Sequence, residues 1–162
     1  MSAELAVYVC LALGLSSALV AGVFQSFSDF VMRSLVAAQS GAGIEAMQMI
    51  NRKVYRSVFL VMLLGLVPAT ISLTAVAYAN FSGAGLNLIV AGTIIYLVTV
   101  FGVTMVGNVP MNNRLDRLVG GTDEADNYWR IYGSSWTRLN HVRTIGSVAT
   151  AICLLLAAVA LD

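Results

Sequence analysis

The chain has 162 residues, of which 59% are hydrophobic and only 10% are charged, and its mean hydropathy is +0.84. Soluble domains carry roughly 25% charged residues, so this composition excludes an ordinary soluble fold and predicts a lipid bilayer as the medium. The net charge of +1 gives no basic excess that would favour nucleic acid as a partner, and the length fits one domain, residues 1–162.

The basic residues cluster in two segments of the chain, separated by long stretches without charge. All nine basic residues lie in the segments 33–56 and 114–143, and three stretches carry no charge: 5–28, 57–113 and 144–161. A membrane span takes about 20 apolar residues, so the middle stretch supplies two spans and each of the others one. Lys and Arg beside spans stay on the cytoplasmic side. We therefore expect a multi-pass protein of the inner (plasma) membrane with both termini on the extracytoplasmic side.

Glycine-rich segments divide the chain into four helices of similar length, predicted at 5–39, 44–79, 86–119 and 122–161. Each is longer than the hydrocarbon layer requires, so we expect the helices to extend on the cytoplasmic side. Short connections between helices of similar length favour antiparallel neighbours. The predicted fold is an all-α, up-down-up-down four-helix bundle in the membrane.

The first helix lacks the basic n-region of a secretory signal, and its apolar run is longer than a signal h-region, so we expect it to be retained. Small residues recur in it every four positions, at Gly14, Ala18, Gly22 and Ser26. This spacing lets helix backbones approach closely in lipid. It predicts a helix contact, either within the bundle or between two copies in a homo-oligomer. Gln25 lies near the inner end of the span.

Polar side chains recur at the inner end of the next two spans. Asn51 and Tyr55 come just before the second span, and Asn108 and Asn112 bracket Pro110 at the end of the third. Proline cannot donate to the carbonyl four residues back and usually kinks or ends a helix. The two asparagines either satisfy that kink or face a polar cavity, since irregular backbone at membrane depth needs protein or water partners.

The fourth helix is predicted to begin in water, with Thr122 as its N-cap. Further along, Trp136 and Asn140 lie one turn apart, as do Arg138 and His141, and Arg143 follows just before the span. Four helices bring all these polar groups to one depth. The sequence therefore predicts a partly aromatic, partly amide-lined pocket at the cytoplasmic end.

No metal or cofactor site is predicted. One histidine and two distant cysteines, Cys10 and Cys153, form no ligand cluster of recognised spacing. The cysteines fall in the outer halves of two spans, and we assign no disulfide because buried cysteine is commonly a small hydrophobe. Phosphate-binding and dinucleotide-binding glycine motifs are also absent.

Two segments carry a family resemblance: Gly107 to Leu115, with its Asn-x-Pro-x-Asn sequence, and Trp136 to Thr144. Together with the glycine-rich first helix and Asn-x-x-x-Tyr before the second span, they make the chain similar to the anthrone oxygenase-like family of small four-span membrane proteins. The resemblance implies oxidation of an anthrone methylene to a quinone by O2, without metal or flavin.

From this resemblance and the residues, we predict a role for each polar side chain. His141 is the predicted base, because histidine is the usual general base near neutral pH, and Asn108, Asn112 and Asn140 are predicted hydrogen-bond donors to enolate oxygens. Arg143 is the predicted countercharge. The predicted substrate-binding residues are Gln25, Asn51, Tyr55, Trp136 and Arg138. Replacement of His141 by Ala is then expected to abolish turnover.

The residues leave other roles open. His141 at a helix end suits an interfacial residue bonded to a carbonyl, and Arg138 and Arg143 suit anchors for lipid headgroups. The same pocket suits a non-enzymatic binder or transporter of a quinone-like or lipidic small molecule. A structural subunit is the third alternative, because fold and family do not fix function.

Overall fold

The structure is a computed structural model that describes residues 1–161, and all its regular elements are helical. The elements are α1 (Ala3–Ser26), the π-helix η1 (Phe27–Val31), α2 (Met32–Ala37), α3 (Ser40–Val54), α4 (Val58–Asn80), α5 (Gly83–Ile95), the π-helices η2 (Tyr96–Gly102) and η3 (Thr104–Asn108), α6 (Val109–Asp116) and α7 (Asp123–Ala160).

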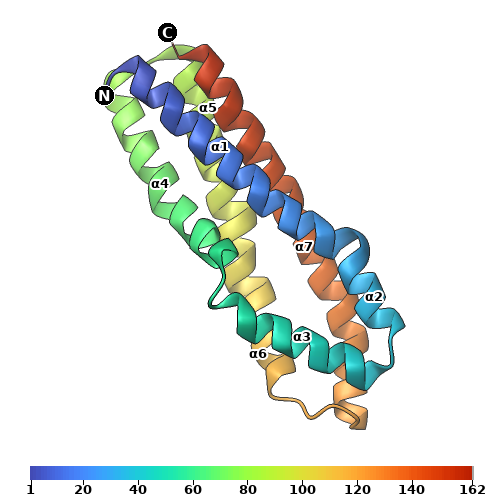
Figure 1. Cartoon of the computed structure of the whole chain (residues 1–162). Coiled ribbons are helices and arrows are strands. Elements are labelled where there is room, and N and C mark those ends of the chain that lie inside the picture. Colours follow the sequence, from blue (N-terminus) through green and yellow to red (C-terminus); the bar gives the residue numbers. More distant parts are fainter. Residues whose placement is uncertain (162) are drawn as a thin grey trace.

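These elements form four long rods, in which α1, η1 and α2 make the first, α3 and α4 the second, α5 to α6 the third, and α7 the fourth. Consecutive rods are antiparallel, and both termini lie at one end (Figure 1). We call the opposite end, which carries all the basic residues, the basic end. The predicted all-α four-helix bundle is confirmed.

Four helices are long and apolar enough to cross a membrane: Ala3–Ala37, Val58–Asn80, Gly83–Asp116 and Asp123–Ala160. The length and composition of these helices are therefore those of a multi-pass membrane protein. Its membrane and its orientation there stay predictions.

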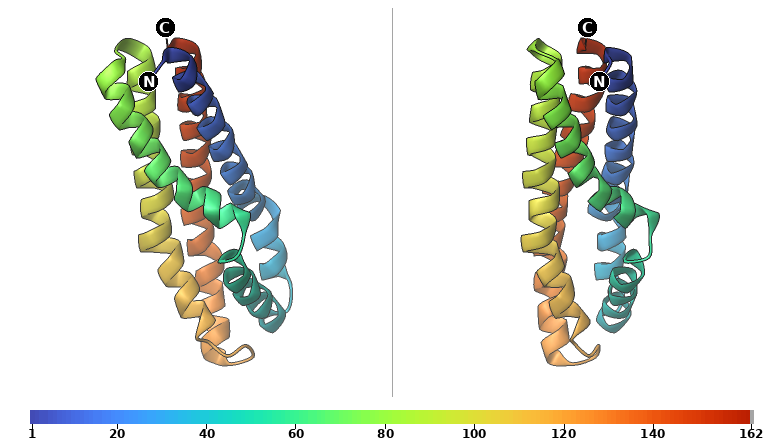
Figure 2. Two further views of the ribbon diagram at one scale, coloured as in Figure 1. Left: turned by 60° about the vertical axis from the view of Figure 1, so that its left-hand side comes forward. Right: turned by 90° about the vertical axis from the view of Figure 1, so that its left-hand side faces the viewer.

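The second rod differs from the prediction, because the helix expected over 44–79 is interrupted at residues 55–57. Ser57 is the cause: its hydroxyl donates to the carbonyl of Val54 at 2.7 Å and accepts from the amide of Leu60 at 3.2 Å. A serine that binds the backbone in this way ends one helix and caps the next. The break gives α3 and α4 different directions (Figures 1 and 2).

The centre of the bundle is α7, which packs along α1 on one side and α5 on the other (Figure 2). Small residues permit the close approach: a Cβ on Gly14 would lie 2.9 Å from Leu155, and a Cβ on Gly92 would lie 3.1 Å from Cys153. The small residues Gly14, Ala18, Gly22 and Ser26 were predicted to contact another helix, and within the chain only part of this set does so. Ala18 and Gly22 are exposed. Both cysteines are free thiols.

Candidate functional site

A cavity of about 130 Å³ lies at the basic end, beside the break between α3 and α4. One wall is apolar and comes mainly from the first two rods, through Phe24, Phe27, Phe59, Leu60 and Leu63. The polar lining comes from all but the first rod: Asn51, Tyr55, Thr104, Asn108, Asn112, Trp136 and Arg143. The cavity therefore combines an aromatic surface with amides and one permanent cation.

Six of the ten residues predicted from the sequence line this cavity, namely Asn51, Tyr55, Asn108, Asn112, Trp136 and Arg143. Asn140 lies behind the wall and contacts Arg143. The other three, Gln25, Arg138 and His141, are exposed and do not line the cavity.

The positions of these residues around α7 explain why some of them line the cavity and others do not. Trp136, Asn140 and Arg143 occupy positions i, i+4 and i+7, so they share one face. His141 is one residue beyond Asn140 and shares a different face with Arg138. The observed arrangement does not support the predicted role of His141 as the base, because its side chain does not reach the cavity.

Arg143 is the central charge of the site. Its side chain is only 5% exposed, and no carboxylate within residues 1–161 lies within 4.0 Å of it. Nη2 donates to Oδ1 of Asn140 at 2.6 Å, while Nη1 lies 3.5 Å from Oγ1 of Thr104. The guanidinium also lies 4.3 Å from the ring centroid of Phe24 and 5.1 Å from that of Trp136.

Ring faces and amide oxygens compensate a buried cation only in part, because each carries a partial negative charge. A buried charge without a counter-ion is costly. The wall around Arg143 therefore favours a ligand that brings an anionic or strongly polarised oxygen.

Unpartnered polar atoms gather at the same place. Among the described residues, six buried side-chain nitrogen or oxygen atoms have no hydrogen-bond partner, and three belong to cavity residues: Nδ2 of Asn51, Oδ1 of Asn108 and Nε of Arg143. Buried polar groups in proteins are nearly always paired. Two donors and one acceptor of cavity residues are thus buried without a hydrogen-bond partner among the described residues.

Asn112 fixes the aromatic side of the cavity. Its Oδ1 accepts from the hydroxyl of Tyr132 at 2.8 Å and from Nε1 of Trp136 at 2.9 Å. Asn108 donates from Nδ2 to the carbonyl of Trp136 at 3.3 Å. Hydrogen bonds to both the ring nitrogen and the backbone carbonyl therefore hold Trp136 in place.

Asn140 connects the first rod to α7 behind the cavity wall. Its Nδ2 lies 2.7 Å from both the carbonyl of Phe24 and the hydroxyl of Ser28, and its Oδ1 accepts from Arg143. This amide is fully buried. It orients the guanidinium and is not itself exposed to the cavity.

Two π-helical segments position lining residues. Phe27 belongs to η1, and Thr104 and Asn108 belong to η3, which directly precedes the helix turn containing Pro110. Single π turns inside α-helices are frequent at functional sites. Pro110 does not end the rod, because the wider turn before it accommodates the missing donor.

The sequence interpretation missed Thr104, Phe24 and Phe27. Thr104 is four residues before Asn108, and this helical spacing was the available signal for it. The two phenylalanines had no distinguishing signal within an apolar stretch.

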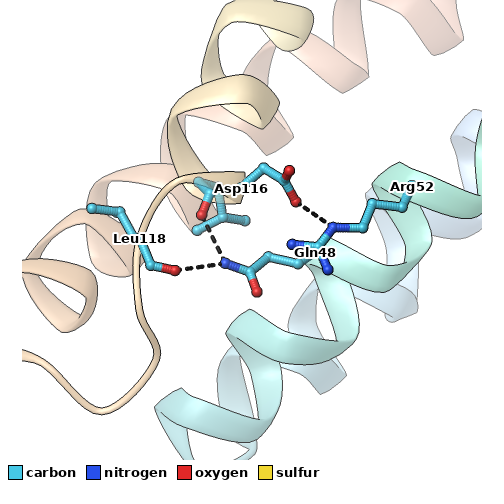
Figure 3. A network of polar contacts seen from close by, with 5 residues as sticks. Gln48, Arg52, Asp116 and Leu118 are labelled. Carbon is cyan, nitrogen blue, oxygen red and sulfur yellow. Dashed lines mark hydrogen bonds and ion pairs between the residues drawn. The ribbon is translucent and has the colours of Figure 1, made fainter.

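A polar clamp holds α3 against the end of α6 (Figure 3). Gln48 donates from Nε2 to the carbonyls of Leu115 and Leu118 at 2.8 and 2.9 Å, beside the C-terminal end of α6. Arg52 pairs with Asp116 at 2.8 Å, but both side chains are about half exposed, where an ion pair contributes little. Gln48 is therefore the stronger part of the clamp.

The comparison with protein families identifies the family of the chain. A sequence model described as anthrone oxygenase matches residues 52–153, which is more than half of the chain. The chain belongs to the anthrone oxygenase family. Searches of the curated proteins and of the solved structures found no match.

The family match spans the part of the chain that supplies most of the polar lining. It includes Asn108, Asn112, Trp136 and Arg143 and begins one residue after Asn51. Among residues 1–161, no three His, Cys, Asp or Glu side chains are grouped so that they could hold a metal ion. The polar groups that line the cavity are a guanidinium, three amides and the hydroxyls of Thr104 and Tyr55, beside aromatic rings.

Proposed function

We propose that the chain is a membrane oxygenase that binds an anthrone-like aromatic substrate in this cavity and oxidises its methylene carbon with O2, without metal or flavin. The observation that carries the proposal is the buried guanidinium of Arg143, which has no carboxylate partner and is flanked by two aromatic rings. Family membership supplies the reaction class.

The substrate fits the chemistry of the wall. An anthrone enolises to a phenol-like tautomer, whose anion is flat, aromatic and electron-rich. A cation at hydrogen-bonding distance favours the ionised form of such a hydroxyl, so Arg143 stabilises the enolate. Nδ2 of Asn51 is a second donor to oxygen substituents, and Phe24 and Trp136 bind the rings.

The reaction balances with O2 alone. The enolate transfers one electron to O2, and the resulting radical and superoxide combine to form a carbon–oxygen bond at the former methylene carbon. The peroxide then loses water, so that one CH2 group and one O2 give one C=O group and one H2O. The protein's part is to hold the enolate and exclude competing reactions.

Water at the open side of the cavity takes the substrate's proton in this proposal. The lining contains no histidine or carboxylate, and its titratable members are Arg143 and Tyr55, which is 65% exposed. Because Arg143 favours the ionised substrate and water accepts the proton, this mechanism does not require His141 as a base.

The same lining favours a second candidate function. A cavity without a conventional general base also suits binding or transport of a quinone-like or lipidic molecule without chemistry. Bound quinone in protein that takes up no oxygen would support this alternative.

Oxygen consumption separates the two candidates. Protein purified in mild detergent is mixed with an anthrone, and uptake of O2 is measured together with the mass of the product formed under ¹⁸O2. The oxygenase predicts equal consumption of anthrone and O2, with one labelled oxygen in the new carbonyl. Anthrone that binds but is oxidised no faster than in protein-free detergent would contradict it.

A further inference from the structure

A second hollow, of about 460 Å³, lies outside the cavity on the surface between α2 and α7. Its cationic members are Arg33 from α2 and Arg130 and Arg138 from α7. Its floor includes Met32, Val36 and Gly133. We call this hollow the arginine groove. It shares no lining residue with the cavity.

Glycine keeps the two helices of the groove close together. A Cβ on Gly133 would lie 2.9 Å from Cγ2 of Val36. The hydroxyls of Ser134 and Thr137, which also line the groove, donate to backbone carbonyls of α7. The guanidiniums are therefore the donors that the groove offers to a ligand.

These arginines have no acidic partner. Within residues 1–161 no carboxylate lies within 4.0 Å of any of the three, although Asp29 lies one helical turn before Arg33 and Asp126 one turn before Arg130. Arg130 donates to the neutral side chain of Asn127 at 2.7 Å. Three positive charges thus surround an apolar floor without a direct ion pair to any of them among residues 1–161.

The depth of the groove indicates what compensates these charges. Arg33 lies five residues after the first charge-free stretch, and Arg138 lies six residues before the last one. At about 1.5 Å per residue, these are roughly 8 and 9 Å beyond the spans, whereas Arg130, fourteen residues before the last stretch, is roughly 21 Å beyond it. Lipid headgroups occupy roughly 5–8 Å on each side of the hydrocarbon core, so the long side chains of Arg33 and Arg138 reach their phosphates.

We propose that the arginine groove binds the headgroup of an anionic phospholipid, with its phosphate on the guanidiniums of Arg33 and Arg138 and its upper acyl chain against Met32 and Val36. Basic pockets between membrane helices bind anionic headgroups by the same electrostatics. The apolar floor favours a lipid over a free phosphate ion. Arg138, predicted from the sequence to bind substrate, is a lipid ligand in this proposal, which is independent of the proposed oxygenase activity.

Native mass spectrometry of the detergent-purified protein tests the proposal, with phosphatidylglycerol and phosphatidylcholine as probes. The groove variant carries Arg33→Gln, Arg130→Gln and Arg138→Gln. The matched control carries Lys53→Gln, Arg56→Gln and Arg117→Gln, which remove three exposed charges from the same end of the bundle outside the groove. We expect roughly twenty-five-fold weaker binding of phosphatidylglycerol by the groove variant and about twofold or less in the control.

The single variants Arg33→Gln and Arg138→Gln serve as the test if the triple variant does not fold, and each is expected to weaken binding about fivefold. Equal losses in the groove and control variants would overturn the proposal, because they would indicate attraction to the whole basic end. Equal binding of phosphatidylcholine would also overturn it. Inorganic phosphate that displaces phosphatidylglycerol at matched concentration would show an ion site instead of a lipid site.

Discussion

Asn140 and Arg143 lie one turn apart on α7 and are joined by a hydrogen bond of 2.6 Å from the guanidinium to the amide oxygen. The amide nitrogen of Asn140 is at the same time bound to the carbonyl of Phe24 and the hydroxyl of Ser28. The cation of the cavity is therefore positioned by a residue that is anchored on the first rod. Orientation of Arg143 and association of the two rods depend on the same amide.

Replacement of Asn140 by Ala is expected to lower both stability and activity. It removes one of the donors to the Phe24 carbonyl, which keeps the backbone N–H of Phe27, and it leaves Arg143 without its shortest hydrogen bond. A buried group left unpaired costs about 1–3 kcal/mol. Thermal unfolding in detergent measures the first effect and anthrone oxidation the second. The matched control is Asn127→Ala, which removes an exposed asparagine of α7. Similar melting temperatures for the two variants would contradict the anchoring role.

Asn112 is expected to be required for the position of Trp136, and its neighbour Asn113 is not. The Asn112→Leu variant removes the shared acceptor of Trp136 and Tyr132, whereas Asn113 is exposed and supplies a matched Asn113→Leu control. We expect Asn112→Leu to raise KM for an anthrone and to destabilise the protein by about 1–3 kcal/mol. A steady-state titration of both variants checks this, and equal KM values would count against the role of Asn112.

The exposed position of His141 gives a prediction opposite to that from the sequence. The His141→Ala variant is expected to keep anthrone turnover within about twofold of the wild type, because the side chain does not line the cavity. The pH profile of turnover should keep its shape as well. A large loss of activity in folded protein would restore the histidine as the base.

Close packing of α7 against the third rod predicts a strong effect at Gly146. A Cβ there would clash with the side chain of Thr99, and overpacking of this kind typically costs about 1–3 kcal/mol. Gly146→Ala is therefore expected to lower the melting temperature, and addition of Thr99→Ala to restore part of it. Gly22→Ala is the control, since nothing lies within 4 Å of a Cβ at that position. Equal stability of both glycine variants would refute this packing.

The four rods could be predicted from the sequence because the positions of charged residues and the lengths of apolar stretches reflect whole helices. It was insufficient for the faces of α7: His141 and Arg138 were selected for their chemistry, while Trp136, Asn140 and Arg143 share the face that packs inward. Helical spacing alone separated these two sets but did not say which one faced the core.

The hydrophobic pattern also did not predict local features of the backbone. The apolar run continues through the break before α4, so hydrophobicity did not reveal it, although Ser57 has the side chain of an N-cap. The π turns that present Phe27 and Asn108 leave no periodic signal, because a one-residue change of phase is smaller than the uncertainty of a helix boundary.

Oxygen uptake by an Arg143→Gln variant tests the central claim most directly. This substitution removes a buried charge that has no carboxylate partner among residues 1–161, so it leaves no opposite charge stranded, and we expect folded protein by circular dichroism. Anthrone-dependent O2 consumption should fall roughly a hundredfold, recover in part with Arg143→Lys, and stay within about twofold in the Arg138→Gln control. Folded Arg143→Gln protein that consumes O2 at the wild-type rate would contradict the claim that this guanidinium holds the substrate anion.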